Sequence, residues 1–147
     1  MIALLQRVSQ ARVEIAGETV GAIGPGLLVL VCAEPGDTEA VGQRLLAKVL
    51  RLRIFADDLG KMNRSLQDVL GGLLNELMGS RAGEPSSGSV PGFSGAARAA
   101  LGEALYNAFV AAARAAHQPV ATGRFGADMQ VHLVNDGPVT IPLRMAG

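Results

Sequence analysis

Leu27 to Ala33 (LLVLVCA) is a continuous apolar run that sits between two groups of turn residues. Gly24-Pro25-Gly26 precedes it and Glu34-Pro35-Gly36 follows it. An apolar run of this length with such punctuation is typical of a strand that is buried on both faces. We therefore expect residues 27–33 to form a central strand of a sheet. The two valines in the run favour a strand over a helix.

The segments on either side of this run predict an α+β domain. Residues 2–15 and 19–23 have a β-favouring composition and are separated by Ala16-Gly17-Glu18, which predicts antiparallel strands in the N-terminal third. A short strand is expected at residues 54–56, followed by a turn at residues 57–61.

Two helices are predicted from apolar spacing. The first lies near Asp37–Leu52 and the second near Leu101–Ala116, because apolar residues three or four positions apart form one stripe along a helix. The residues of the two stripes are Val41, Leu45, Val49 and Leu52 in the first helix, and Leu101, Leu105, Phe109 and Ala112 in the second.

Near the C-terminus, apolar residues at 129, 131 and 133 alternate with polar ones, which predicts a half-buried strand. Asn135-Asp136-Gly137-Pro138 is a strong turn signal, and Val139 to Leu143 is expected to form a last strand. Pro142 suggests that this strand ends at the edge of the sheet. The Gly137-Pro138 bond is a candidate cis peptide, and a plain tight turn is the alternative.

Composition excludes several functional classes. The chain has 147 residues, with 13 Lys and Arg against 13 Asp and Glu, so its zero net charge rules out nucleic-acid binding by bulk charge alone. One Tyr, four Phe and no Trp argue against a platform of stacked aromatics. A single cysteine excludes an intrachain disulfide and a thiolate zinc cage. With no signal peptide or apolar membrane span, a soluble cytoplasmic protein is expected.

No side-chain catalyst stands out. His117 and His132 are scattered and belong to no metal-ligand spacing, so each is interpreted as a surface or structural histidine. Cys32 lies in the apolar run and is interpreted as core filler. The catalytic residues are therefore unknown from the sequence.

Several motifs nevertheless resemble the D-aminoacyl-tRNA deacylases, also called the D-Tyr-tRNA deacylase family. The resemblance covers residues 1–72 and 91–147, in the order that the family has. The closing segment, residues 133–140 (LVNDGPVT), is one of its signature motifs. The other matching segments are residues 1–8, 24–30, 53–55, 60–63 and 122–131.

The resemblance implies a single domain over residues 1–147, with a β-barrel or antiparallel sheet and two main flanking helices. It implies a homodimer that hydrolyses the ester of D-aminoacyl-tRNA without metal or cofactor, with mischarged glycyl-tRNA as a further substrate. In the family, Gly137 and Pro138 would form a cis peptide that reaches into the partner's active site and rejects L side chains. Arg7 would hold that peptide. The other residues implied to bind or orient substrate are Phe125, Met129, Asn135, Asp136, Val139 and Thr140.

The resemblance is interrupted after Leu74. The family has Ser-Gln-Phe-Thr-Leu here on a buried strand, whereas this chain has Asn75-Glu76-Leu77-Met78 and then a Gly/Ser-rich stretch. Our hypothesis is that residues 69–90 are read out of frame. We expect residues 73–90 to be aberrant, Asn75–Ser89 to be irregular, and turnover to be slower than in a chain with the motif. The alternatives are an inactive remnant that dimerises and at most binds the tRNA acceptor end, and a dimeric scaffold unrelated to tRNA.

Overall fold

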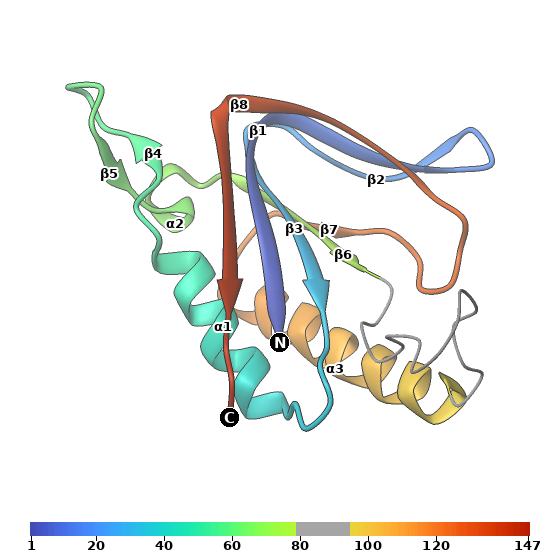
Figure 1. Ribbon diagram of the computed structural model, residues 1–147. Coiled ribbons are helices and arrows are strands. Elements are labelled where there is room, and N and C mark those ends of the chain that lie inside the picture. The colour runs from blue at the N-terminus through green and yellow to red at the C-terminus, as the bar shows by residue number, and fades with distance from the viewer. Residues whose placement is uncertain (79–94) are drawn as a thin grey trace.

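The structure, a computed structural model, describes residues 1–78 and 95–147. Six strands form one strongly curved mixed sheet, and helices cover one of its faces (Figure 1). The sheet order is β2-β1-β3-β6-β7, with β8 paired to the other side of β1. These strands are β1 (Ile2–Ile15), β2 (Glu18–Ile23), β3 (Gly26–Cys32), β6 (Gly72–Leu77), β7 (Val120–Thr122) and β8 (Gln130–Arg144).

The expected central strand is β3. It is buried on both faces and pairs with β1 on one side and with β6 on the other. The α+β class is confirmed, and the N-terminal strands are antiparallel as predicted. The sheet is mixed, however, because β3, β6 and β7 run parallel to one another. The sheet nearly closes into a barrel: a Cβ on Gly21 of β2 would lie 2.5 Å from the carbonyl oxygen of Thr122 in β7.

The first predicted helix is α1 (Glu39–Arg51), whose N-cap Thr38 accepts a hydrogen bond from the Val41 backbone N–H. Val41, Leu45 and Val49 are buried as expected, whereas Leu52 lies at the C-cap and is half-buried. A small ribbon of β4 (Phe55–Ala56) and β5 (Met62–Arg64) and a short helix α2 (Leu66–Val69) follow. The ribbon encloses the predicted turn at residues 57–61.

The second predicted helix is α3 (Gly95–Ala116), which begins earlier than the apolar stripe suggested. Leu105 and Phe109 are buried against the sheet and α1, and Ala112 is partly buried. Leu101 was expected in the same stripe, but 49% of its surface is exposed. Leu101 therefore contributes less to the core than its sequence pattern indicated.

The predicted turn at residues 135–138 does not separate two strands. Residues 130–144 form the single strand β8, and both of its halves pair antiparallel with β1. The register shifts between Gln6 and Gln10 of β1, opposite the Asn-Asp-Gly-Pro sequence, so these residues form a bulge at a bend of β8. Pro142 pairs with Leu4 on a strand whose other edge is unpaired among the described residues, as expected of proline. The expected inward position of Val131 is wrong, since 37% of its surface is exposed.

The expectation of irregular chain from Asn75 onward is also wrong as far as Leu77. Residues 75–77 belong to β6, which pairs with β3 over six positions and with β7 over three. The backbone hydrogen bonds of its neighbours are thus kept over residues 72–77. The rest of the predicted irregular segment, residues 79–89, lies outside the described residues.

Two apolar clusters hold these elements together. The larger lies between the sheet and the helices and includes Leu27, Leu45 and Phe109. The smaller lies on the other face of the sheet, inside the nearly closed barrel, and includes Val13, Leu28 and Leu74. Successive residues of β6 therefore face different clusters, as the alternation of side chains along a strand requires.

The N-terminal ammonium group is bound within the fold. The nitrogen of Met1 lies 2.8 Å from a carboxylate oxygen of Asp37 and 2.8 Å from the carbonyl oxygen of Met145. Met1 is only 1% exposed. This contact ties the start of β1 to the loop before α1 and to the chain after β8. No helix in the described part of the chain is long and apolar enough to cross a membrane.

Candidate active site

The bulge of β8 is held in shape by the side chain of Asn135. Its amide oxygen accepts a hydrogen bond of 2.8 Å from the Val139 backbone N–H. Its amide nitrogen donates to the carbonyl oxygen of Val139 at 3.2 Å and to the hydroxyl of Thr140 at 3.0 Å. The residues between them include Gly137 and Pro138, whose peptide bond is cis. An asparagine and a threonine thus fix the two ends of a short exposed loop.

Arg7 of β1 holds the same loop from the other side. Its Nε donates a hydrogen bond of 3.0 Å to the carbonyl oxygen of Asp136, and its Nη1 donates one of 2.6 Å to the carbonyl oxygen of Ile54. A Cβ on Gly137 would lie 3.0 Å from Nη2 of Arg7 and 2.8 Å from Cγ2 of Val139. Gly137 also has a φ of +138°, which L side chains rarely adopt, so only glycine fits here.

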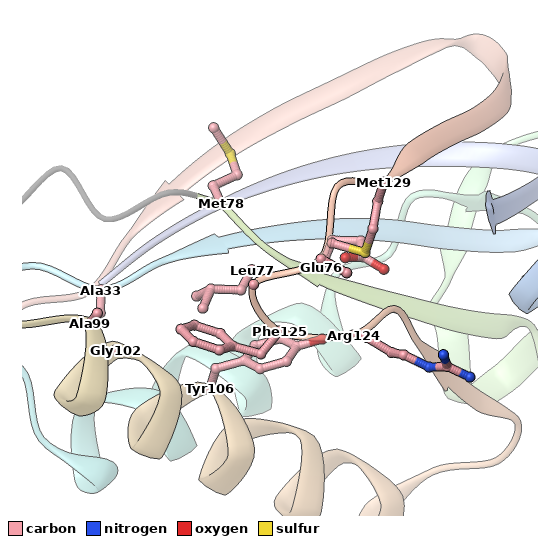
Figure 2. A pocket seen from close by; sticks show the side chains of 12 residues that line it. Ala33, Glu76, Leu77, Met78, Ala99, Gly102, Tyr106, Arg124, Phe125 and Met129 are labelled. Atoms are coloured by element: carbon pink, nitrogen blue, oxygen red, sulfur yellow. The ribbon is translucent and has the colours of Figure 1, made fainter. Parts of the chain in front are cut away.

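A cavity of about 350 Å³ opens at the carboxyl end of β6 (Figure 2). Phe125 and Met129, from the segment that joins β7 to β8, form part of its wall, and Tyr106 approaches from α3. Most of its lining surface is apolar, whereas Arg124 adds a cation that points away from the cavity in this view. A mostly apolar cavity with a few polar groups is typical of a small-molecule site.

Two polar side chains of β6 are buried beside this cavity. Asn75 is 0% exposed, and neither polar atom of its side-chain amide has a partner among the described residues. Glu76 is 3% exposed, and its Oε1 has no partner in the same part of the chain. Burial raises the pKa of the Glu76 carboxyl, and a hydrogen bond from the Gly123 backbone N–H partly opposes that effect.

Tyr106 is fixed by a bond to the same strand. Its hydroxyl donates a hydrogen bond of 2.8 Å to the carbonyl oxygen of Asn75. Burial, and then the charge of Glu76, raise the pKa of this hydroxyl well above its usual range, while Arg114 opposes them. Tyr106 is therefore a neutral donor at physiological pH.

The residues singled out in the sequence fall into two groups within one chain. Phe125 and Met129 line the cavity. Arg7 and residues 135–140 gather at the bend of β8, and none of them lines the cavity. In Figure 1 the bend and the carboxyl end of β6 lie at different ends of the sheet. A single chain thus does not bring the two groups together.

Sequence reasoning missed Tyr106 and Glu76 as cavity residues. No sequence pattern marked Tyr106 as a site residue, apart from its place in a predicted helix. Glu76 lay in a segment that was expected to be irregular. The two histidines behave as structural residues: His117 is buried, with Nε2 2.6 Å from the carbonyl oxygen of Gly71, and His132 pairs with Glu14. Cys32 is buried. Within residues 1–78 and 95–147, no cluster of three His, Cys, Asp or Glu residues has the geometry of a metal site.

Comparison with known proteins assigns the chain to a family. The model of D-Tyr-tRNA(Tyr) deacylase matches residues 4–144. The chain belongs to the D-Tyr-tRNA(Tyr) deacylase family. It is 63% identical to a D-aminoacyl-tRNA deacylase of Acidovorax ebreus, with 99% of each chain covered. It is 65% identical to that of Paracidovorax citrulli, where the match covers 99% of this chain and 94% of the relative.

Solved structures give the same result for the fold. A c-Myc DNA unwinding element binding protein superposes with a TM-score of 0.86 at 36% identity, and the match covers both chains completely. A probable eukaryotic D-amino acid tRNA deacylase superposes with a TM-score of 0.76 over 97% of each chain. At 17% identity, the second likeness shows the fold alone. The family assignment made from the motifs is confirmed.

Proposed function

We propose that this protein hydrolyses the ester bond of D-aminoacyl-tRNA and so removes D-amino acids from tRNA before translation uses them. The observation that carries this proposal is the loop at residues 136–138, held by Arg7 and Asn135 in a chain that matches the deacylase family along its length. Names of relatives that are 63% and 65% identical support the same activity. The alternative of an inactive remnant has no support in these comparisons.

The loop at the bend of β8 acts as the chirality filter. Asp136, Gly137 and Pro138 are exposed, so their backbone atoms are accessible to a second molecule. Because the cavity of the same chain lies elsewhere, the filter serves a partner subunit, and the active form is a homodimer. The Gly137 carbonyl then faces the chiral carbon of the substrate and clashes with an L side chain. Discrimination by a built-in clash accepts many D side chains, and also glycine, which has none.

The cavity beside β6 receives the aminoacylated 3′ end of tRNA. Phe125 and Met129 offer apolar contacts to the terminal nucleotide, and the positive charge of Arg124 at the rim favours the approach of tRNA phosphates. Tyr106 carries a hydroxyl that stays neutral, and it holds the strand that forms the cavity floor. Charged tRNA is consumed in the cytoplasm, which is therefore where we place the protein.

The reaction needs water as the only co-reactant. The water oxygen attacks the ester carbonyl carbon, the bond to the ribose oxygen breaks, and the water's protons pass to that oxygen and to the solvent. An aminoacyl ester is already reactive, and the neighbouring 2′-hydroxyl of the substrate can assist the attack. The protein then contributes positioning and donors for the developing oxyanion, effects that together supply several kcal/mol of barrier lowering.

The test is deacylation of D-tyrosyl-tRNA beside L-tyrosyl-tRNA by purified protein. We expect release of D-tyrosine and retention of the L ester. A second protein that carries Ser-Gln-Phe-Thr-Leu after Leu74 serves as the comparison, and we expect it to be faster when equal amounts of folded dimer are used. Binding of tRNA without hydrolysis of either ester would instead favour the inactive remnant.

A further inference from the structure

Glu76 lines the cavity, is buried, and has incomplete hydrogen bonding within the described residues. Its Oε1 is inaccessible to solvent and has no partner there, while the residue as a whole is 97% buried. A buried carboxyl that lacks a partner is costly to a fold, since each such group lowers stability unless something else satisfies it. A bound ligand is a natural source of the missing donor, because Glu76 forms part of the cavity wall.

The surroundings of this carboxyl give it no counter-charge among the described residues. The Gly123 backbone N–H is the one hydrogen-bond donor that lowers the pKa of this carboxyl, and it opposes the larger effect of burial. None of the described ion pairs includes Glu76, although Arg124 lines the same cavity. Figure 2 shows the carboxyl beside the thioether of Met129, which is no hydrogen-bond donor.

Gly123 makes this arrangement possible. A Cβ at that position would lie 2.5 Å from Sδ of Met129 and 2.8 Å from Oε2 of Glu76, and it would also touch Oε1. The absence of a side chain lets the backbone approach the carboxyl closely, so that its position is fixed between β6 and the segment after β7. The free oxygen is therefore held in place before any ligand arrives.

We propose that Oε1 of Glu76 accepts a hydrogen bond from an amino group of the bound acceptor end and so makes amine recognition part of substrate selection. This rests on the proposed function. An amino group fits better than a neutral hydroxyl because a cationic or polarised N–H donor offsets the charge of a carboxylate that has no other counter-ion. The aminoacyl end offers this chemistry twice, in the α-ammonium of the amino acid and in the exocyclic amine of the terminal adenine.

The experiment compares three ligands that cannot be hydrolysed. The first is 3′-deoxyadenosine with D-tyrosine joined to its 3′ position through an amide. The second lacks the α-amino group, and the third carries purine in place of adenine and so lacks the exocyclic amine. Calorimetric binding to the wild-type protein is expected to weaken by roughly tenfold on loss of one of these amines, as for the loss of one charge-assisted hydrogen bond. The ligand that binds more weakly identifies which amine the protein recognises, and the Glu76→Gln variant assigns that contact to Glu76.

Two variants complete the test. Glu76→Gln keeps the shape of the side chain and removes its charge, and we expect the preference for the amine to fall to less than about threefold, since a neutral bond is weaker. Glu18→Gln, at an exposed position of β2 that does not line the cavity, should keep the wild-type preference. Equal wild-type affinity for all three ligands, or an unchanged preference in Glu76→Gln, would overturn the inference.

The outcomes for this inference and for the proposed function are separable. Hydrolysis of D-tyrosyl-tRNA together with equal binding of the three ligands would contradict the role proposed for Glu76 and support the proposed function. Amine-dependent binding without hydrolysis would support the role of Glu76 and contradict the function. Because the comparison of ligands needs only the wild-type protein, it stands even if Glu76→Gln does not fold.

Discussion

Replacement of Asn75 by leucine is expected to stabilise the protein. Asn75 is fully buried on the face of β6 that also carries Leu73, which belongs to the apolar cluster between the sheet and the helices. Both polar atoms of its side-chain amide lack partners in the part of the chain described here. The hydrogen bond from Tyr106 goes to the backbone carbonyl and would survive the substitution.

The size of the gain in stability follows from these two polar atoms without hydrogen-bond partners. A buried polar group without a partner costs about 1–3 kcal/mol. Leucine is similar in shape and adds favourable apolar burial, although any local crowding offsets part of the gain. We expect Asn75→Leu to raise the free energy of unfolding by about 1–3 kcal/mol, and each kcal/mol raises Tm by roughly 2–4 °C in a domain near this size.

Urea unfolding followed by circular dichroism measures this change. The midpoint should rise while the slope m stays the same, which indicates a change in stability rather than in the unfolded state. Asn107→Leu is the matched control, because Asn107 is exposed on α3 and its replacement should act only through helix propensity, by a few tenths of a kcal/mol. A loss of more than about 1 kcal/mol in Asn75→Leu would show that the amide is satisfied and that the reasoning fails.

Three further predictions concern charged groups. Burial raises the pKa of the Glu76 carboxyl, so the folded state keeps the proton of this carboxyl at pH values where the unfolded chain has lost it. The free energy of unfolding should therefore fall as pH rises above about 4.5. Urea titrations of Glu76→Gln should show a smaller fall. Asp37→Asn weakens the contact with the Met1 ammonium and should lower the free energy of unfolding, measured in urea, by about 1.5–3 kcal/mol. Asp58→Asn removes one partner of an exposed ion pair and should cost less than about 1 kcal/mol. Equal losses in the two variants would contradict this. Arg7→Lys keeps the positive charge but loses the Nε donor to the carbonyl oxygen of Asp136. The preference for the D over the L ester in deacylation should therefore fall by roughly tenfold. An unchanged preference would show that Arg7 does not contribute to chiral discrimination.

The parts of the fold that followed from the sequence are those in which one local pattern dominates. The spacing of Val41, Leu45 and Val49 placed α1. The unbroken apolar run placed β3, because only a strand with partners on both sides buries both faces. In each case local propensity and tertiary packing favour the same structure.

The errors arose where tertiary pairing overrode local signals. Asn-Asp-Gly-Pro is typical of a hairpin turn, but β1 is long enough to pair with both halves of β8, and the turn sequence became a bulge. Asn75 and Glu76 break any apolar pattern, yet parallel pairing with β3 and β7 keeps β6 as a strand. Because such pairing joins residues far apart in the sequence, no local window could have shown it.

The candidate site divides in the same way. The bend of β8 was found because its motif is contiguous, although its shape depends on Arg7, which lies 129 positions from Asp136. The cavity draws residues from β6, α3 and the segment after β7, and of these only the segment after β7 belonged to a recognised motif, at residues 122–131. Glu76 carried no signal, since its role depends on the close approach of Gly123.

The most direct test of the central claim is the rate at which purified protein releases amino acid from D-tyrosyl-tRNA and from L-tyrosyl-tRNA under the same conditions. The protein should be folded, and Arg7→Lys should be measured beside it. The account predicts hydrolysis of the D ester, little hydrolysis of the L ester, and a reduced preference in the variant. Equal rates for the two esters, or no hydrolysis of either by folded protein, would contradict it.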